Sequence, residues 1–215
     1  MALFTTLRVR SGEVLFWRDH LARLEADESL LEMVAAAVRG MDDARVRITL
    51  RPPHPPLIEA RAYEPPRKPL RLVPVQVSLA GDAPLLKTTD RRRYDDARTR
   101  AGTADDALLT GPDGRVLETT IANIFFLLPG GVVTPPAAGI LPGIARARLL
   151  GIAREAPVDL AMAAEATACV VTNAVFLAHP VAAIQGVKEF ASEALARDLR
   201  EAMDETAPHL RIIER

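Results

Sequence analysis

The chain has 215 residues, of which 49% are hydrophobic and 26% charged, so it is long enough to bury a core in one domain or in two small ones. Its formal net charge of −1 at pH 7 gives no electrostatic footprint for nucleic acid or for an anionic membrane surface. No apolar run approaches the roughly 20 residues of a membrane span, and the first residues lack a signal-peptide pattern, so we expect a cytoplasmic protein.

The first part of the chain predicts a sheet with helices. Residues 2–9 and 14–17 flank a Ser-Gly-Glu turn and predict a hairpin. Apolar residues at helical spacing predict one helix from Arg18 to Arg39, which Gly40 ends. Three further strand patterns, separated by proline-rich turns, are expected to join the same sheet: residues 44–51, 56–64 and 70–78.

A change of composition near residues 79–84 predicts a linker. We therefore expect an N-terminal α/β domain over residues 1–82 and a C-terminal mixed domain over residues 83–215, which is an α/β (α+β) fold class.

The C-terminal part begins with a helical pattern from Asp90 to Ala101 and continues as a strand series punctuated by Pro-Asp-Gly and Pro-Gly-Gly turns. Further helices are expected after Gly143, around Met162 to Ala166, and from Glu189 to Met203, with Lys188 at the start of the last one. The expected strands cover residues 106–110, 115–119, 124–128, 132–134, 169–172 and 180–186.

Several kinds of chemistry are disfavoured by the residues present. The single cysteine, Cys169, lies in an apolar run and is expected to be a buried strand residue without a disulfide partner. The four histidines are scattered, with none four residues from another ligand, so we expect no metal site. A Gly-x-Ser-x-Gly motif is absent from the sequence, which argues against a serine hydrolase of that type.

Lys87 is the most conspicuous residue of the sequence. The cations are mostly arginines, and only Lys68, Lys87 and Lys188 are lysines. Arginine replaces lysine in most salt bridges but forms no Schiff base. Because Lys68 lies in a proline-bracketed loop and Lys188 beside the last predicted helix, we interpret both as surface charges and Lys87 as the candidate reactive amine.

Lys87 and residues before and after it in the chain can supply what pyridoxal phosphate needs from a protein. Lys87 is the amine that holds the aldehyde and later the general base. Glu118, on a predicted strand, can bind the ring nitrogen, although a solvent-facing carboxylate is the alternative. The backbone N–H groups of Gly143, Ile144 and Ala145 form a predicted helix start that can bind phosphate. Arg23 can add a charge-assisted contact, or it is a helix-surface arginine.

The order of these motifs resembles the class IV aminotransferase family, the fold-type IV pyridoxal phosphate enzymes. The motifs are H-x-x-R-L at residues 20–24, K-T-x-x-R-x-x-Y at 87–94, D-G-x-V-x-E-T-x-x-x-N-I-F at 113–125 and I-L-P-G-I-x-R at 140–146. The resemblance implies two α/β domains with the cofactor between them, and a homodimer. It also implies that Arg23 binds phosphate, that Lys87 and Glu118 hold the ring, that Ile144 and Ala145 begin the phosphate helix, and that Asn123 shapes the active-site turn.

Two segments resemble the aminodeoxychorismate lyase branch of that family. Phe4 to Arg8 match F-T-T-x-R, where branched-chain enzymes have F-E-G-I-R, and residues 172–174 read T-N-A rather than G-T-A. The resemblance implies that Thr6 assists elimination, that Thr172 contacts substrate, and that Asn173 orients substrate or phosphate, unless Asn173 is a turn residue. An aminotransferase acting on branched-chain, D-amino acid or amine substrates is the runner-up, and a non-catalytic family member is the third reading.

Three further residues have open roles. Arg8 and Arg51 are candidates for binding a substrate carboxylate, or they are charges at strand edges. Tyr94 could lie near the ring hydroxyl of the cofactor or anchor the helix that contains it. The sequence departs from the family pattern at Ala145, where threonine is common, and at Ala174, where a hydroxyl is common, so we expect phosphate to rely on backbone donors.

Overall fold

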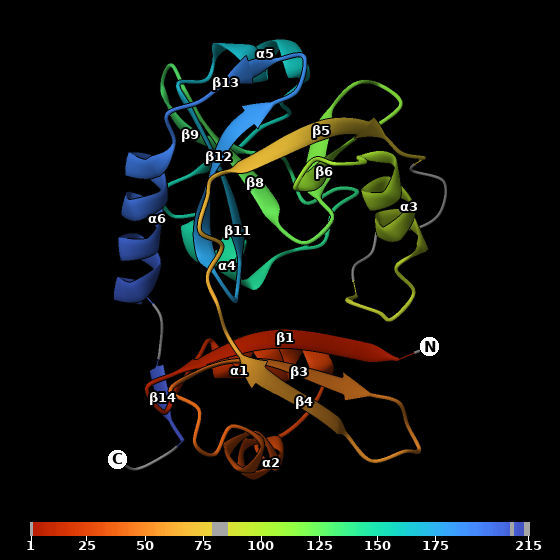
Figure 1. Ribbon diagram of the computed structural model, residues 1–215, viewed down its shortest axis with the longest axis vertical. Coiled ribbons are helices and arrows are strands. Elements are labelled where there is room, and N and C mark those ends of the chain that lie inside the picture. The colour runs from red at the N-terminus through yellow and green to blue at the C-terminus, as the bar shows by residue number, and fades with distance from the viewer. Residues whose placement is uncertain (1, 79–85, 207–208, 213–215) are drawn as a thin grey trace.

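A computed structural model describes residues 2–78, 86–206 and 209–212 of the chain. Figure 1 shows two packed parts, a smaller sheet with two helices below and a larger curled sheet flanked by helices above. The expected fold class, α/β (α+β), is confirmed, and the N-terminal sheet is antiparallel.

The smaller sheet contains five strands among the described residues, in the order β14-β2-β1-β3-β4 and antiparallel throughout. Alternation sets its two faces, because Ala44, Val46 and Ile48 of β3 are fully buried in the core beneath the sheet. The C-terminal strand β14 joins this sheet although the sequence predicted no strand after the last helix. The strands are β1 (Leu3–Arg10), β2 (Glu13–Leu15), β3 (Asp43–Leu50), β4 (Leu57–Ala62) and β14 (His209–Arg211).

The helical segment of this part is two helices, α1 (Trp17–Leu24) and α2 (Leu30–Ala37), and the single helix expected from Arg18 to Arg39 is wrong. Glu25 ends α1 in the left-handed region, with φ of 53°. The Asp27 carboxylate then accepts a hydrogen bond of 2.8 Å from the Ser29 N–H, which stabilises the turn between the helices. The apolar spacing across the break still buries one face of each helix, which is why periodicity concealed the break.

The larger sheet contains nine described strands, in the order β10-β9-β8-β11-β12-β5-β6-β7 with β13 beside β12. The strand β5 is parallel to both neighbours, β12 and β6, and β10 is parallel to β9. The strands are β5 (Leu70–Gln76), β6 (Asp106–Thr110), β7 (Val116–Thr119), β8 (Asn123–Leu128), β9 (Gly131–Thr134), β10 (Arg154–Glu155), β11 (Ala168–Asn173), β12 (Leu177–Ile184) and β13 (Lys188–Glu189).

The position of β5 corrects the expected grouping of strands. The sequence placed residues 70–78 in the N-terminal sheet, whereas β5 lies in the larger sheet, where Leu72 packs with Leu108 and Val181. The proline-rich turn before β5 carries the chain from one sheet to the other (Figure 1). The predicted linker and the boundary at residues 82 and 83 lie outside the described residues, so the domain division stays a prediction.

Four helices of the described chain accompany the larger sheet. The last begins at Glu193, later than expected, because Lys188 and Glu189 form β13 against β12. It packs with α4 against β11 and β12, around Leu149, Leu195 and Leu199. Among the described residues, no helix is long and apolar enough to cross a membrane. The helices are α3 (Arg92–Arg100), α4 (Ile144–Leu149), α5 (Leu160–Glu165) and α6 (Glu193–Thr206).

Candidate active site

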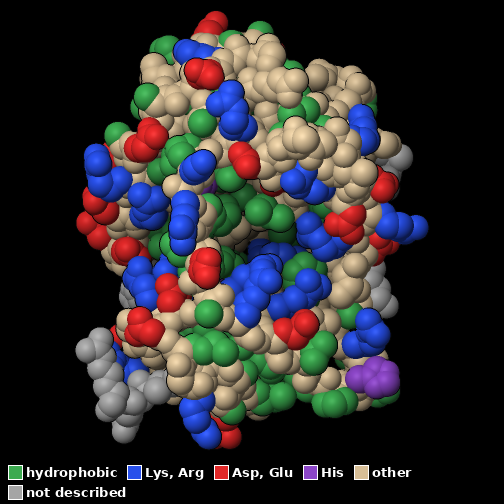
Figure 2. All heavy atoms as spheres, in the orientation of Figure 1, with side chains coloured by type: hydrophobic (Ala, Val, Ile, Leu, Met, Phe, Trp, Pro, Cys, Tyr) green, Lys and Arg blue, Asp and Glu red, His purple; other side chains and the backbone are tan. Residues whose placement is uncertain are grey.

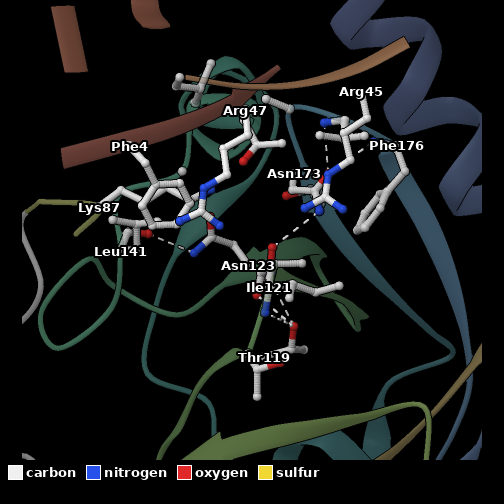
Figure 3. Close-up of a pocket in the computed structure, with 18 of the residues that line it drawn as sticks. Phe4, Arg45, Arg47, Lys87, Thr119, Ile121, Asn123, Leu141, Asn173 and Phe176 are labelled. Atoms are coloured by element: carbon white, nitrogen blue, oxygen red, sulfur yellow. Dashed lines mark hydrogen bonds between the residues drawn. The ribbon is translucent and has the colours of Figure 1, made fainter. Parts of the chain in front are cut away.

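A cavity of about 550 Å³ lies between the two sheets. Its walls come from β1, β3 and β4 of the smaller sheet and from β7, β8 and β11 of the larger one. Figure 3 shows the side chains that converge on the cavity. In Figure 2, Lys and Arg side chains gather around a hollow in the middle of the molecule. The predicted site residues that line it are Thr6, Arg23, Lys87, Tyr94, Glu118, Asn123, Ile144, Thr172 and Asn173.

Lys87 is held against the edge of β1. The Phe4 N–H donates to the Lys87 carbonyl at 2.8 Å, and the Thr89 N–H donates to the Ala2 carbonyl at 2.9 Å. The side chain is partly buried, with Nζ 5.1 Å from the centre of the Phe4 ring. Burial, followed by the nearby charges of Arg23, Arg91, Arg45 and Arg47, lowers the pKa of Lys87 to about 7. A large fraction of this amine is therefore neutral at physiological pH, which a nucleophile or base requires.

Glu118 is the buried carboxylate of the site. Its Oε1 accepts hydrogen bonds from the Tyr94 hydroxyl at 2.8 Å and the Leu141 N–H at 3.0 Å, and its Oε2 accepts one from Asn123 Nδ2 at 3.2 Å. Burial raises the pKa of Glu118 to about 7, against the opposing effect of the hydrogen bonds from Leu141 and Tyr94. Burial and the Glu118 carboxylate together raise the pKa of Tyr94, so the phenol keeps its proton. A cation placed beside Glu118 would stabilise its ionised form.

Tyr94 anchors the helix that contains it, and its proximity to the ring hydroxyl of the cofactor stays a prediction. It lies on α3, lines the cavity, and anchors this helix to β7 through Glu118. The Arg91 guanidinium lies over its ring at 4.8 Å and donates to the Thr120 carbonyl at 2.7 Å.

Asn123 and Gly143 fix the turn beside Glu118. Asn123 Nδ2 donates to the Leu141 carbonyl at 3.0 Å as well as to Glu118. A Cβ atom on Gly143 would lie 1.9 Å from Asn123 Oδ1, so only glycine leaves room for the asparagine side chain. The role of Asn123 in shaping an active-site turn stays a prediction.

The candidate phosphate end of the cavity is formed by Arg23 and the start of α4. The Arg23 guanidinium donates to the Pro142 carbonyl, immediately before Gly143, and burial lowers the pKa of Arg23. Gly143 and Ile144 line the cavity, whereas Ala145 is fully buried behind them. The first N–H groups of a helix have no intrahelical acceptor, and Arg23 brings positive charge to the same end.

Thr6, Thr172 and Asn173 lie on the remaining walls. Thr6 and Thr172 are 7% and 1% exposed, and Thr172 Oγ1 has no hydrogen-bond partner in the described part of the chain. Asn173 Oδ1 accepts from the N–H groups of Val175 and Phe176 at 2.9 and 3.0 Å, and Nδ2 donates to the Ile121 carbonyl at 3.3 Å. The turn role of Asn173 is therefore observed, and its contact with a ligand stays a prediction.

Arg8 is placed differently from its predicted role. Its guanidinium pairs with the Asp43 carboxylate, with Nε 2.7 Å from Oδ1, and stacks over the Tyr63 ring at 4.4 Å. Neither Arg8 nor Arg51 is among the described residues that line the cavity. The carboxylate of Asp43 on the adjacent strand β3 holds Arg8 in a structural ion pair, which no local sequence pattern indicates.

Three arginines that sequence reasoning missed also line the cavity: Arg45 and Arg47 of β3 and Arg61 of β4. The signal was present in the strand pattern, because arginines alternate there with apolar residues that face the core. Tyr63, beside the end of β4, was missed as well.

The arrangement fits pyridoxal phosphate. One cavity holds an amine with a lowered pKa at Lys87, a buried carboxylate at Glu118 and a cationic end at Arg23. The buried hydroxyl of Thr172 in the same cavity has no hydrogen-bond partner among the described residues. The cavity volume lies within the range usual for cofactor sites, roughly 300–1,000 Å³. No group of three or more His, Cys, Asp or Glu side chains in the described ranges is arranged to hold a metal ion.

Comparison with known proteins places this geometry in a family. Residues 28–184 match the model of the family Amino-transferase class IV, and no curated protein sequence matches the chain. A protein from Mesorhizobium loti provisionally assigned as an amino-acid aminotransferase is 29% identical, with a TM-score of 0.77 over 85% of this chain and 99% of that one.

Two more distant structures share the fold. One, from Legionella pneumophila, is provisionally assigned as a 4-amino-4-deoxychorismate lyase and is 21% identical, with a TM-score of 0.79 over 95% of this chain and 90% of that one. The branched-chain aminotransferase of Thermoproteus uzoniensis is 22% identical, with a TM-score of 0.82 over 95% and 84%. Because the family match spans most of the sequence, the chain belongs to the class IV amino-transferase family.

Proposed function

We propose that this chain is a pyridoxal phosphate-dependent lyase that converts 4-amino-4-deoxychorismate into 4-aminobenzoate and pyruvate, a reaction of folate synthesis. The observation that carries the choice of reaction is the position of Thr6, whose side chain lines the same cavity as Lys87 from the adjoining strand β1. A hydroxyl there can deliver a proton to a departing oxygen, which an elimination requires and a transamination does not.

Residues of both sheets would hold the cofactor. Lys87 would bind its aldehyde, Glu118 would accept a hydrogen bond from its ring nitrogen, and Arg23 with the N–H groups that begin α4 would hold its phosphate. When bound, pyridoxal phosphate draws electrons away from the carbon that bears the substrate amino group and so makes the proton on that carbon acidic. The buried, hydrogen-bonded carboxylate of Glu118 favours the positively charged ring that supplies this effect.

Lys87 then acts as the base. Its neutral amine removes the proton from the carbon bearing the amino group, and the neighbouring C–O bond breaks as the ring becomes aromatic. Thr6 would donate a proton to the departing enolpyruvyl oxygen and recover one from solvent. Pyruvate and 4-aminobenzoate together contain all the atoms of the substrate, so no oxidant or amino acceptor is consumed.

The experiment that tests this function is incubation of the purified protein, loaded with pyridoxal phosphate, with 4-amino-4-deoxychorismate alone. A lyase produces 4-aminobenzoate without an added oxo acid. Thr6→Val is expected to slow 4-aminobenzoate formation by about 100- to 10,000-fold, the range typical of losing a general acid, while the absorption of the bound cofactor is retained. Thr103→Val is the control because Thr103 is exposed and is not a described lining residue of the cavity.

An aminotransferase is the second candidate, and the cluster of Arg45, Arg47 and Arg61 is the observation that favours it, because glutamate and other dicarboxylates also need cationic sites. Conversion of the bound cofactor to pyridoxamine phosphate by an amino acid, with no 4-aminobenzoate formed, would establish this function in place of the lyase. Borohydride reduction that fixes no cofactor on Lys87 would exclude both. The homodimer and the cytoplasmic location stay predictions.

A further inference from the structure

Arg45 and Arg61 form a pair of like charges at the cavity. They are directly opposite one another on the antiparallel strands β3 and β4, and both line the cavity. Like charges in this cross-strand position repel, and the charge of Arg61 contributes, after burial, to lowering the pKa of Arg45. In the described ranges neither guanidinium forms an ion pair, and the nearby carboxylates of Glu59 and Glu64 form none with them.

Tyr63 adds a hydrogen-bond donor beside this pair. Its hydroxyl oxygen is buried and has no hydrogen-bond partner in the part of the chain that the structure describes. Burial raises the pKa of Tyr63, so the hydroxyl keeps its proton. Arg8, fixed by Asp43, stacks on the ring and holds it in place. A buried donor without an acceptor is costly unless a ligand supplies one.

The third cavity arginine of β3 and β4, Arg47, contacts the side chain of Phe4. Its guanidinium lies 3.9 Å from the centre of the Phe4 ring, and Lys87 Nζ lies over the same ring. Figure 3 shows Arg47 on the side of Phe4 and Lys87, and Arg45 on the side of Asn173 and Phe176. Arg45 therefore lies toward a different part of the cavity from Arg47, although its charge still helps to lower the pKa of Lys87.

We propose that Arg45, Arg61 and Tyr63 form a carboxylate subsite that binds the end of the substrate remote from its reacting amino group. Two guanidinium groups and a phenol match the acceptor oxygens of one carboxylate. The substrate class is then an amine or amino acid with a distal carboxylate. Resting on the proposed function, the group bound is the ring carboxylate of 4-amino-4-deoxychorismate, which lies across the ring from the amino group. Branched-chain amino acids have no such group.

The product 4-aminobenzoate is a direct probe, because it keeps this carboxylate, and 4-aminobenzamide is its neutral counterpart. Binding of both to the holoenzyme is measured by titration calorimetry at one fixed ionic strength. The wild type is expected to bind 4-aminobenzoate at least tenfold more tightly than the amide. Arg45→Gln and Arg61→Gln are each expected to weaken binding of the acid by about 10- to 100-fold, the usual cost of a charge-assisted contact, and to leave amide binding unchanged.

Arg67→Gln is the matched control, since Arg67 is exposed and is not a described lining residue of the cavity. Tyr63→Phe removes only the hydroxyl and tests the third member without changing charge. Urea unfolding of each variant separates loss of the subsite from loss of the fold, and Arg61, exposed at the rim, is the variant expected to fold normally. Equal binding of acid and amide by the wild type, or unchanged acid binding in folded Arg61→Gln and Arg45→Gln, would overturn the subsite.

The same variants distinguish this inference from the proposed function. If the wild type makes 4-aminobenzoate but Arg45→Gln and Arg61→Gln leave KM unchanged, the lyase stands and the subsite is wrong. If no 4-aminobenzoate forms, but binding of the acid still depends on Arg45 and Arg61, the lyase is wrong and the distal carboxylate site stands. With both correct, KM rises by about 10- to 100-fold in both variants. In Arg61→Gln kcat changes much less, because the charge of Arg61 is not among those that lower the pKa of Lys87, whereas Arg45→Gln also removes a charge that lowers it.

Discussion

At the scale of single residues, the side chain of Asn123 occupies the space that a Cβ atom on Gly143 would need. Because a Cβ on Gly143 would come within 1.9 Å of Asn123 Oδ1, Gly143→Ala forces the asparagine away from Glu118 and Leu141. We expect this variant to lower the free energy of unfolding by about 1–3 kcal/mol, the cost of displaced buried hydrogen bonds. In an Asn123→Ala background, where the space is free, Gly143→Ala should cost much less. Urea unfolding of the four proteins measures the coupling, and additive effects would contradict it.

Lys87 offers a second test at this scale, because the sequence has only three lysines. In apoprotein labelled with ¹³C at the lysine ε-carbon, one signal should titrate near pH 7, since burial and four arginines lower the pKa of Lys87 to about 7. Arg91→Gln removes one of these charges and should raise that pKa. Lys87→Arg assigns the signal by removing it. A Lys87 signal that titrates near 10, like those of ordinary lysines, would contradict the prediction.

The sequence identified candidate site residues where the residue type is rare in the chain or belongs to an ordered motif. Lys87 was one of three lysines, and Glu118 and Asn123 stood in an ordered motif. The subsite of Arg45 and Arg61 was missed because it depends on the register of two strands, which no local pattern specifies. The ion pair of Arg8 could not be predicted for a similar reason: its partner Asp43 is 35 residues away in the chain.

At the scale of elements, the break between α1 and α2 rests on Glu25 in the left-handed region, with φ of 53°. Glycine adopts this conformation without strain, so Glu25→Gly is expected to raise the free energy of unfolding by about 0.5–1 kcal/mol. Ala36→Gly, on an exposed position in the last turn of α2, is the control and should lower it by a similar amount. A thermal or urea unfolding curve that moves in the same direction for both would disprove the role of Glu25.

Hydrophobic periodicity identified most helices and strands, but it did not predict where each helix ends or which sheet each strand joins. Neither glycine nor proline marks the stop at Glu25, so the apolar spacing read as one helix. The strand β5 has the same local pattern as its predecessors, yet it pairs with β12 and β6, which follow it by many residues. Strand pairing over such distances is a property of the whole core, because it depends on which apolar faces remain to be covered.

At the scale of the whole molecule, the site joins the two sheets. Lys87 is bonded to the edge of β1 in the smaller sheet, and Glu118 belongs to β7 in the larger one. The two opposite charges share one cavity without an ion pair between them in the described structure. Each charge is thus desolvated in the apoprotein, and folding has to bear both penalties until a ligand compensates them.

This arrangement predicts an unusual pH dependence for the stability of the apoprotein. Glu118 has its pKa raised from 4.5 to about 7, so between these values the folded state binds more protons than the unfolded state and stability falls as pH rises. Lys87 has its pKa lowered from 10.5 to about 7, so the folded state binds fewer protons over that range and stability rises with pH. The contribution of the two groups is therefore least favourable near pH 7.

Lys87→Met isolates the lysine part of this dependence, because methionine keeps the length of the side chain without its charge. From pH 7 to pH 10, the free energy of unfolding of wild-type apoprotein minus that of Lys87→Met should increase by about 1–3 kcal/mol, less than the full value of the pKa shift because water and side-chain rearrangement relieve part of it. Urea unfolding at several pH values measures it, with the other titrating groups cancelling in the difference. A difference independent of pH would mean that Lys87 keeps an ordinary pKa in the fold, and the neutral amine required of a catalytic lysine would then have to arise only after the cofactor binds.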